Sequence, residues 1–333
     1  KNENNALPLA AAEKVSCLLT GSVSFNYATS GSSSADTKGY TDFKTALEGA
    51  GLSVNSDLWE FYEEKISDGY GRYKQGTLYI INEVPYNEYG TVTSTFGEYS
   101  TAIVNIARDS GEGADLTASS NLADGLDGSC LSLSRDEIDV LEALTQMKKA
   151  GAVKKIIVLL NSSATIQLDF LDKETIDVDA CLWIGNVGKS GINAVAKALT
   201  GEIVPSGKLS DTYLKNNFSS PAMMQQNYNT NKSFMSAYEN GGGLIDDSQK
   251  YYGVYSEGIY VGYRYYETRY TDYVNGAGNA GKYAYSGDVA YPFGYGLSYA
   301  DFAYTAFDVK EAEDGKSFDV TVTVKNESET YAG

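Results

Sequence analysis

The amino-acid sequence predicts an α/β fold in which a mostly parallel sheet is flanked by helices, followed by a shorter all-β segment. Apolar runs of strand length alternate with helical periods over roughly the first 200 residues, which is typical of parallel strands joined by helices. The runs are almost continuously apolar, as expected for strands covered on both faces. After about residue 300, apolar and polar residues alternate strictly, which indicates a strand with one exposed face.

The expected strands of the parallel layer are short apolar runs. They cover residues 15–20, 77–81, 101–107, 155–160 and 178–184. Helices are expected over residues 40–50 and 56–67, because both stretches place apolar side chains on one helical face and end at a glycine. A further helix is expected over about residues 190–199.

The clearest helix begins after Ser134. Ser134 and Glu137 have the spacing of a capping box, in which each side chain accepts a hydrogen bond from the backbone of the other residue. Lys148, Lys149 and Gly151 then provide the basic last turn and the stop.

Two later stretches are less regular. Residues 216–247 are rich in Asn, Gln, Ser and Gly, which predicts a long irregular segment. Residues 255–266 are rich in tyrosine and alternate with period two, which predicts a strand that packs a domain seam. A sugar-stacking platform, or an ion pair between Glu257 and Arg264 that fixes a loop, is the alternative reading.

The apolar runs at 302–307 and 318–324 flank a turn-like segment at 313–316 and predict an antiparallel pair of strands. Two strands cannot form an independently stable sandwich. We therefore expect one domain over residues 1–300 and the incomplete start of a second over residues 301–333.

Charge and composition exclude several classes of function. Lys and Arg total 26 against 44 Asp and Glu, a formal net charge of −18. Since neutralising phosphates requires a cationic surface, we expect no nucleic acid and no anionic membrane as partner. No apolar run approaches the roughly 20 residues that span a bilayer, and the first residues do not resemble a signal peptide.

The side chains available for chemistry are mainly carboxylates. Histidine is absent, which removes Ser-His-Asp and Cys-His catalysis and histidine-ligated metals. Cys17, Cys130 and Cys181 are widely spaced and odd in number, so we expect buried thiols rather than a disulfide framework or zinc site. No metal or cofactor is expected. The 28 tyrosines favour amphipathic surfaces of the kind that bind saccharides.

Glu112 is the first candidate for a catalytic group. It lies in the segment Asp109-Ser110-Gly111-Glu112-Gly113, directly after the apolar run 101–107. Ligands collect at the carboxyl ends of parallel strands, and flanking glycines let the backbone bend sharply and leave the carboxylate unobstructed. The residues alone leave a second interpretation open, in which the segment is a polar turn and Glu112 is solvated.

Two other motifs have weaker implications. In the segment 201–209, Lys208 follows Gly207, but the order of residues is not that of a phosphate-binding loop. The segment 158–163 is a strand end with polar residues, which predicts a helix cap or an interdomain hydrogen-bonding site.

Taken in order, seven segments resemble the C-terminal half of glycoside hydrolase family 3 β-glucosidases. They are residues 1–9, 102–113, 158–162, 180–185, 201–209, 257–264 and 291–299. The resemblance implies a six-stranded α/β sandwich over 1–300 and the opening strands of a fibronectin type III-like domain over 301–333. It also suggests a soluble, bacterial-type protein, cytoplasmic or secreted.

The resemblance implies that Glu112 is the general acid/base of a retaining glycosidase, with Asp109, Ser110 and Asp115 shaping its loop. The nucleophile would be an aspartate of a (β/α)8 barrel domain of the same protein, which lies before or after this segment and is absent from it. The substrate would be a β-glucoside or oligosaccharide, and the chain alone would be inactive. Without the barrel, we expect a near-ordinary pKa for Glu112.

A different class of function remains open. In a noncatalytic carbohydrate-binding or assembly module, the tyrosines would matter and Glu112 would not. A homo-oligomer is compatible with either reading. A third interpretation, an autonomous nucleotide-binding α/β protein, is poorly supported because the sequence contains no phosphate-binding loop. Ala114, where many relatives have an aromatic residue, departs from the family pattern.

Overall fold

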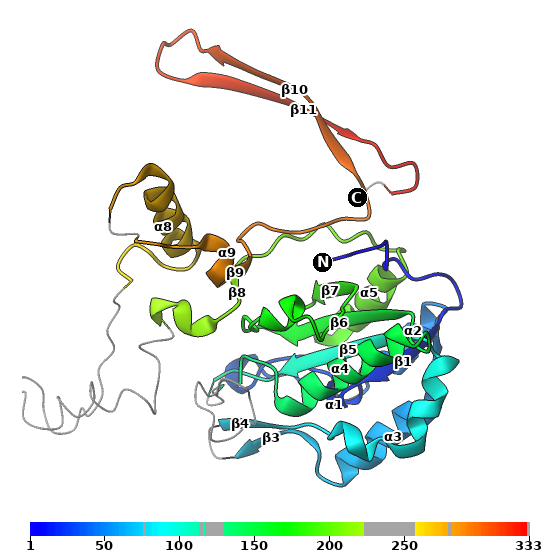
Figure 1. Cartoon of the computed structure of the whole chain (residues 1–333). Coiled ribbons are helices and arrows are strands. Elements are labelled where there is room, and N and C mark those ends of the chain that lie inside the picture. The colour runs from blue at the N-terminus through cyan, green and yellow to red at the C-terminus, as the bar shows by residue number, and fades with distance from the viewer. Residues whose placement is uncertain (76–77, 113–115, 117–129, 223–256, 279–280, 332–333) are drawn as a thin grey trace, which may run out of the picture.

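The computed structural model describes residues 1–75, 78–112, 116, 130–222, 257–278 and 281–331. Its centre is a parallel sheet in the order β2-β1-β5-β6-β7 (Figure 1). These strands are β1 (Lys14–Leu18), β2 (Ser53–Val54), β5 (Thr101–Arg108), β6 (Lys155–Ser162) and β7 (Ala180–Trp183). The predicted class, a mostly parallel sheet flanked by helices, is confirmed.

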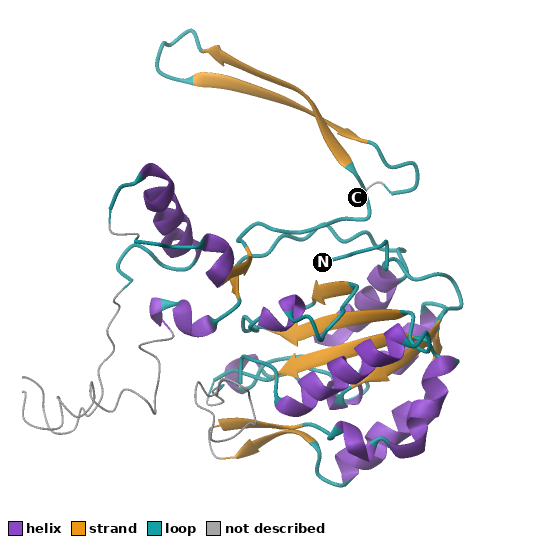
Figure 2. Ribbon diagram, viewed as in Figure 1, coloured by secondary structure: helices purple, strands orange, loops and turns teal. Residues whose placement is uncertain are grey.

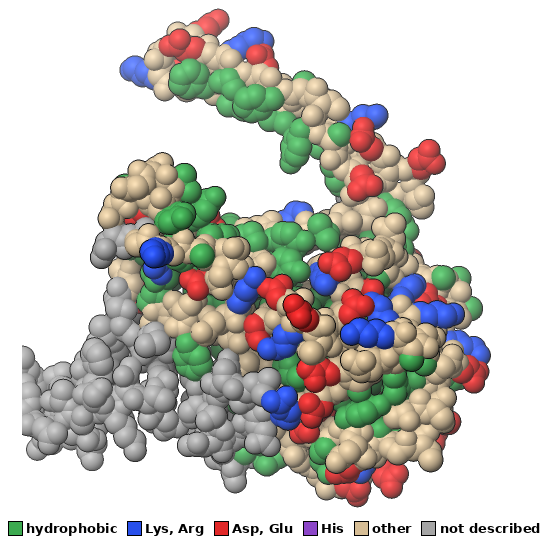
Figure 3. All heavy atoms as spheres, in the orientation of Figure 1, with side chains coloured by type: hydrophobic (Ala, Val, Ile, Leu, Met, Phe, Trp, Pro, Cys, Tyr) green, Lys and Arg blue, Asp and Glu red, His purple; other side chains and the backbone are tan. Residues whose placement is uncertain are grey.

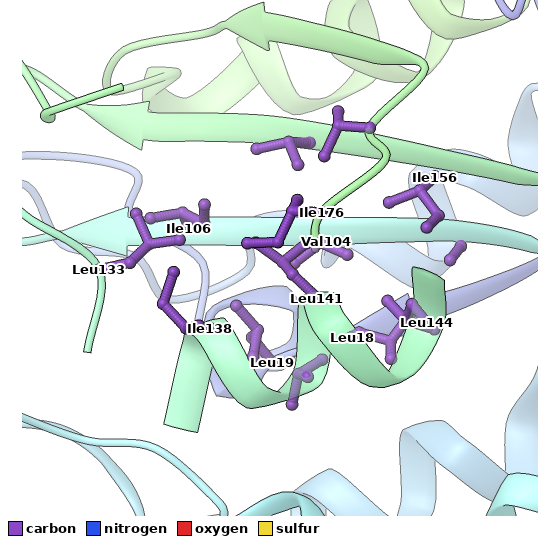
Figure 4. Close-up of a cluster of buried hydrophobic side chains, with 14 of the residues drawn as sticks. Leu18, Leu19, Val104, Ile106, Leu133, Ile138, Leu141, Leu144, Ile156 and Ile176 are labelled. Carbon is purple, nitrogen blue, oxygen red and sulfur yellow. The ribbon is translucent and has the colours of Figure 1, made fainter. Parts of the chain in front are cut away.

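Helices cover both faces of this sheet, as Figure 2 shows. They are α2 (Phe43–Gly49), α3 (Ser56–Ser67), α4 (Arg135–Lys149) and α5 (Gly188–Leu199). One apolar core lies between the sheet and helices α3 and α4 (Figure 4), and a second core includes α2 and α5. In β5, Val104 and Ile106 face the first core and Ile103 faces the second. This two-sided burial explains why the strands are continuously apolar.

Local capping fixes where the helices begin. The Ser134 side chain accepts a hydrogen bond from Glu137 N, and Glu137 Oε2 accepts one from Ser134 N, so the predicted capping box is present at α4. The Asn55 side chain caps α3 in the same way by accepting from Leu58 N. Because a cap satisfies otherwise unpaired N–H groups, both helices begin where the sequence predicts.

The sheet contains five strands, with the chain's first residues at its edge in place of a sixth strand. Asn2 and Ala180 form an antiparallel bridge, Cys181 N donates to Lys1 O, and Glu3 N donates to Asp179 O. The expected six-stranded layer is therefore five parallel strands plus this short antiparallel segment along β7.

The prediction of a parallel strand at 77–81 was wrong. In the structure β4 (Leu78–Asn82) pairs antiparallel with β3 (Gly71–Gln75) in a separate hairpin. A short apolar run has the same pattern in either setting, because Ile80 and Ile81 are buried in the hairpin too.

The prediction of a strand over 255–266 was also wrong where the structure describes it. Ile259 lies exposed in a turn and Val261 lies exposed in the irregular residues that follow it. Gly262, at φ 61°, precedes helix α8 (Tyr263–Asn275). Tyr266 of that helix is buried against Tyr283 and its neighbours, so tertiary packing overrides the short alternation. Most of the irregular segment predicted over 216–247 lies outside the described residues.

The remaining elements are short. They are α1 (Thr20–Val23), α9 (Tyr285–Asp288), β8 (Tyr213–Leu214), β9 (Val289–Tyr291) and the 3₁₀ turns Gly31–Ser33, Tyr86–Glu88, Gly90–Gly97, Asp169–Asp172 and Asn217–Ser219. None of the helices in the described ranges has both the length and the apolar character needed to cross a bilayer.

The last described element is an antiparallel hairpin of β10 (Phe302–Glu311) and β11 (Phe318–Asn326), as the alternating pattern predicts. Tyr304 faces Val324 and Phe307 faces Val322 across the pair. These apolar side chains are largely exposed, with Tyr304 at 80%. Figure 3 shows hydrophobic side chains gathered along one side of the hairpin, where it projects from the α/β body.

Candidate active-site loop

The loop with the predicted site residues begins at a rigid strand end. Arg108, the last residue of β5, is fully buried, and its Nη1 and Nη2 each donate to one oxygen of Glu137 at 2.7 Å. Its Nε donates to Cys130 O at 2.6 Å and its Nη2 to Ser132 O at 3.0 Å. This network ties the end of β5 to the start of α4, so the following residues leave the sheet from a fixed point.

Asp109 is held by an ion pair that the sequence does not reveal. Arg72 of the β3–β4 hairpin donates from Nε to Asp109 Oδ2 at 2.7 Å, and its Nη2 donates to Ser24 O at the same distance. The Arg72 side chain is 6% exposed and that of Asp109 is 21% exposed. Asp109 is thus occupied in fixing the first turn of the loop.

Ser110 lies beside the end of the neighbouring strand. Its Oγ is 3.4 Å from Ser163 Oγ, directly after β6. The structure therefore brings the loops after β5 and β6 together. Asp115 lies outside the described residues.

Glu112 is exposed, and its carboxylate reaches the loop that follows β1. Its Oε2 accepts hydrogen bonds from Ser32 N at 2.9 Å and from Ser32 Oγ. These bonds, first that from the side chain and then that from the backbone, lower the pKa of Glu112 below its ordinary value. The pKa is lowered and not raised, and the expectation of a near-ordinary pKa did not include the partner Ser32.

Polar residues at the carboxyl ends of three strands are also tied together. Asn161 Oδ1 accepts from Asn26 N at 2.7 Å, and Asn161 Nδ2 donates to Asn26 O at 2.9 Å and to Gly185 O at 2.7 Å. The Asn161 side chain does not cap a helix, which was one of the two roles predicted for the segment 158–163. It joins the loops after β1, β6 and β7, so this edge of the sheet is a rigid platform.

Sequence reasoning missed Ser32 and Arg72. A signal for Ser32 exists, because the Gly/Ser-rich run at 30–34 is in the connection that follows the predicted strand 15–20, and this strand lies next to β5 in the sheet. Arg72 gives no such signal, since its position depends on a hairpin that the apolar pattern assigns to the parallel layer.

A pocket of about 280 Å³ lies beside β7, away from the Glu112 loop. Its lining includes Leu160, Leu168, Trp183, Tyr213, Tyr291 and Tyr295. Trp183 is 41% exposed, and its Nε1 donates to Ser162 O at 2.9 Å. Lys208 also lines the pocket and donates to Gly296 O, so it has a backbone partner rather than a phosphate cradle.

Cys17 and Cys130 are buried and Cys181 is half-buried. Within the described ranges, no group of three or more cysteine, aspartate or glutamate side chains is arranged to hold a metal ion.

Comparison with known proteins identifies the family. Residues 1–263 match the family model of the glycosyl hydrolase family 3 C-terminal domain. The chain belongs to this family. The family assignment, first indicated by the seven ordered segments, is confirmed.

Curated relatives of this family 3 domain include β-glucosidases. The chain is 28% identical over 315 residues to the beta-glucosidase of Ruminococcus albus and 28% identical over 322 residues to beta-glucosidase A of Butyrivibrio fibrisolvens. The matches cover 92% and 91% of this chain but 27% and 33% of the two relatives. The chain thus spans about a third or less of their length.

Solved structures of the family have the same fold over nearly the whole chain. Beta-glucosidase 3B from Thermotoga neapolitana, in complex with α-D-glucose, is similar with a TM-score of 0.70 and 26% identity, covering 98% of this chain and 39% of that one. A beta-glucosidase from Paenibacillus barengoltzii gives a TM-score of 0.69 at 26% identity and covers 97% of this chain and 30% of its own.

Proposed function

We propose that this family 3 domain supplies the general acid/base, Glu112, to the active site of a retaining β-glucosidase-type glycoside hydrolase. The observation that carries the proposal is an exposed carboxylate at the carboxyl end of a central parallel strand, on a loop fixed by the Arg108–Glu137 and Arg72–Asp109 ion pairs. A carboxylate that must reach a substrate held by another domain needs both exposure and a rigid mount.

The second carboxylate would come from a (β/α)8 barrel of the same protein. In a retaining mechanism, the protonated acid gives its proton to the departing glycosidic oxygen while a nucleophilic carboxylate, about 5 to 5.5 Å away, attacks the anomeric carbon. Water then displaces the nucleophile, and Glu112 takes the proton of that water. The substrate class is a β-glucoside or oligosaccharide.

The environment of Glu112 fits the base form of this cycle in the absence of substrate. Ser32 stabilises the ionised carboxylate, which lowers its pKa. Burial against a barrel and a bound sugar, together with the negative charge of the nucleophile, would raise the pKa toward the range of an acid at neutral pH. Docking of the barrel would thus convert a solvated carboxylate into a proton donor.

The test is the leaving-group dependence of a Glu112→Gln variant in the protein that includes the barrel. We expect the rate of glycosylation to fall most for glucosides with poor leaving groups, because these depend on protonation, and least for activated aryl glucosides. Glu48→Gln, an exposed glutamate on α2, is the matched control. An unchanged rate with a poorly activated glucoside would remove Glu112 from the mechanism.

The 333-residue chain alone is expected to be inactive on aryl β-glucosides, since it lacks the nucleophile. Turnover by the purified chain that disappears in Glu112→Gln would show that no barrel is needed.

The β10–β11 hairpin is proposed to open a fibronectin type III-like domain that begins near residue 301, after the α/β sandwich of residues 1–300. Its support is the amphipathic pairing of the hairpin, with one apolar face and one polar face.

The pocket beside β7 favours a second candidate, a noncatalytic carbohydrate-binding role. Half-exposed aromatic rings such as Trp183 are typical stacking surfaces for sugar rings. Titration with methyl β-glucoside tests it. Chemical-shift changes at Trp183 that are lost in Tyr291→Ala would support the role, and shifts confined to the Glu112 loop would contradict it.

A further inference from the structure

The loop after β1 lies directly against the loop that contains Glu112. Ser30 and Gly111 form a parallel bridge, and Ser30 Oγ donates to Glu112 O at 3.2 Å. Gly31, at φ 71°, is so close that a Cβ atom at this position would overlap the Cβ of Glu112. The absence of a side chain at Gly31 therefore permits the approach that places Ser32 beside the carboxylate.

The contacts of Ser32 distinguish the two carboxylate oxygens. Both the backbone N–H and the hydroxyl of Ser32 donate to Oε2 of Glu112. Among the residues that the structure describes, none donates a hydrogen bond to Oε1. Oε2 is thus anchored by Ser32, whereas Oε1 has no donor among the described residues.

We propose that Ser32 is a positioning residue that anchors Oε2 of Glu112, so that Oε1 is the oxygen that exchanges protons with the substrate. The inference rests on the proposed role of Glu112 as the acid/base. It adds a residue from a different loop, 80 positions away in the sequence, to that role.

The chemistry follows from the number of donors on each oxygen. When Glu112 is protonated, the proton resides on Oε1, because Oε2 already accepts two hydrogen bonds. In the first step the Oε1–H bond breaks, the proton moves to the glycosidic oxygen, and the bond from that oxygen to the anomeric carbon breaks as the nucleophile's bond forms. In the second step water loses its proton to Oε1 as its oxygen bonds to the anomeric carbon, and the bond from that carbon to the nucleophilic carboxylate breaks. Ser32 keeps its own proton throughout.

The first experiment measures this contact without relying on catalysis. Carboxyl carbons of glutamate are labelled with ¹³C in the 333-residue chain, the Glu112 signal is assigned with Glu112→Gln, and its titration is followed by NMR. Ser32→Ala removes the hydroxyl donor, so the Glu112 pKa should rise. Ser32→Thr retains a hydroxyl, so the Glu112 pKa in this variant should be close to that of the wild type. The exposed Ser34→Ala is the matched control.

A Glu112 titration that is the same in Ser32→Ala as in the wild type would overturn the inference. Failure of Ser32→Thr to restore the wild-type titration would also contradict it, since a purely steric role of the serine would then explain the change.

The second experiment separates this inference from the proposed function. In the protein that includes the barrel, Ser32→Ala should lower kcat for poor leaving groups by about tenfold, as expected for the loss of one oriented hydrogen bond. The limb of the pH–rate profile that depends on the ionisation of Glu112 should also move to higher pH, and KM should change little. If Glu112→Gln is fully active while Ser32→Ala still raises the Glu112 pKa measured by NMR, then Glu112 is not the acid/base, but its contact with Ser32 is confirmed. If Glu112→Gln is impaired but Ser32→Ala matches the wild type in rate and pH profile, only the role of Ser32 falls.

Discussion

Arg108 and Glu137 are the residues on which the geometry of the Glu112 loop most depends. The guanidinium and the carboxylate are 0% and 2% exposed, and they form a bidentate pair at the end of β5. A buried pair contributes little net stability, but the removal of one partner leaves a buried charge without compensation. The role of this pair is therefore to fix a loop direction.

We expect Glu137→Ala to lower the free energy of unfolding by about 3 to 5 kcal/mol, measured by urea denaturation. The substitution leaves the buried Arg108 guanidinium without its carboxylate partner and also removes the glutamate of the α4 capping box. Asp139→Ala in the same helix removes only an exposed pair with Arg135 and should cost about 0.5 kcal/mol or less. Equal effects of the two substitutions would contradict the account.

Glu83 is a buried carboxylate that should make stability depend on pH. Burial raises its pKa from 4.5 to about 7, although Thr20 and Val84 donate hydrogen bonds to it, and the charge of Glu137 adds to the rise. The folded state retains this proton while the unfolded state loses it. The contribution of Glu83 to the free energy of unfolding is thus fully present below pH 4.5 and is lost as pH rises through about 7.

The expected loss over that window is on the order of 3 kcal/mol. Glu83→Gln is neutral at every pH, so its free energy of unfolding should fall less between pH 5 and pH 8 than that of the wild type. Glu60→Gln, an exposed position in α3, is the control. The same pH dependence in wild type and Glu83→Gln would show that Glu83 does not cause it.

At the scale of single elements, the sequence predicts best where local signals and packing agree. Helix α3 has the predicted bounds, 56–67, because the Asn55 cap, the apolar stripe and Gly69 all favour them. The β3–β4 hairpin and α8 were mispredicted because a short apolar or alternating run does not specify its partner. Ser32 and Arg72 could not be assigned for the same reason, since each meets its carboxylate through tertiary structure.

The β10–β11 hairpin is the element whose apolar face lacks cover in the described residues. Val309, Val320 and Phe307 lie on that face, and Phe307 is 72% exposed. An isolated two-stranded hairpin is marginally stable in water.

We expect its amides to exchange much faster than those of residues 158–160 in β6 at low protein concentration, and to become protected at high concentration if apolar faces pair between copies. Hydrogen exchange at the two concentrations measures both effects. Exchange as slow as in β6, in a chain shown to be monomeric, would mean that the hairpin is stable alone and that a boundary near residue 301 is wrong.

At the scale of the whole molecule, the fold places the exposed carboxylate of Glu112 at the rigid carboxyl-end edge of the parallel sheet. The α/β class, most helices and the Glu112 loop follow from periodicity, capping and the carboxyl-end rule. The chemistry of the loop depends on contacts from three separate segments, around residues 32, 72 and 163, which no local pattern brings together.

The central claim, that Glu112 is the acid/base of a retaining glycosidase, is tested most directly by azide rescue in the protein that includes the barrel. Glu112→Ala lacks the base for the second step, so azide, which needs no deprotonation, should attack the covalent intermediate. We expect a rate that rises with azide concentration for an activated aryl β-glucoside, with β-glucosyl azide as product. Hydrolysis at the wild-type rate, or a rate that azide leaves unchanged with glucose as the only sugar product, would contradict it.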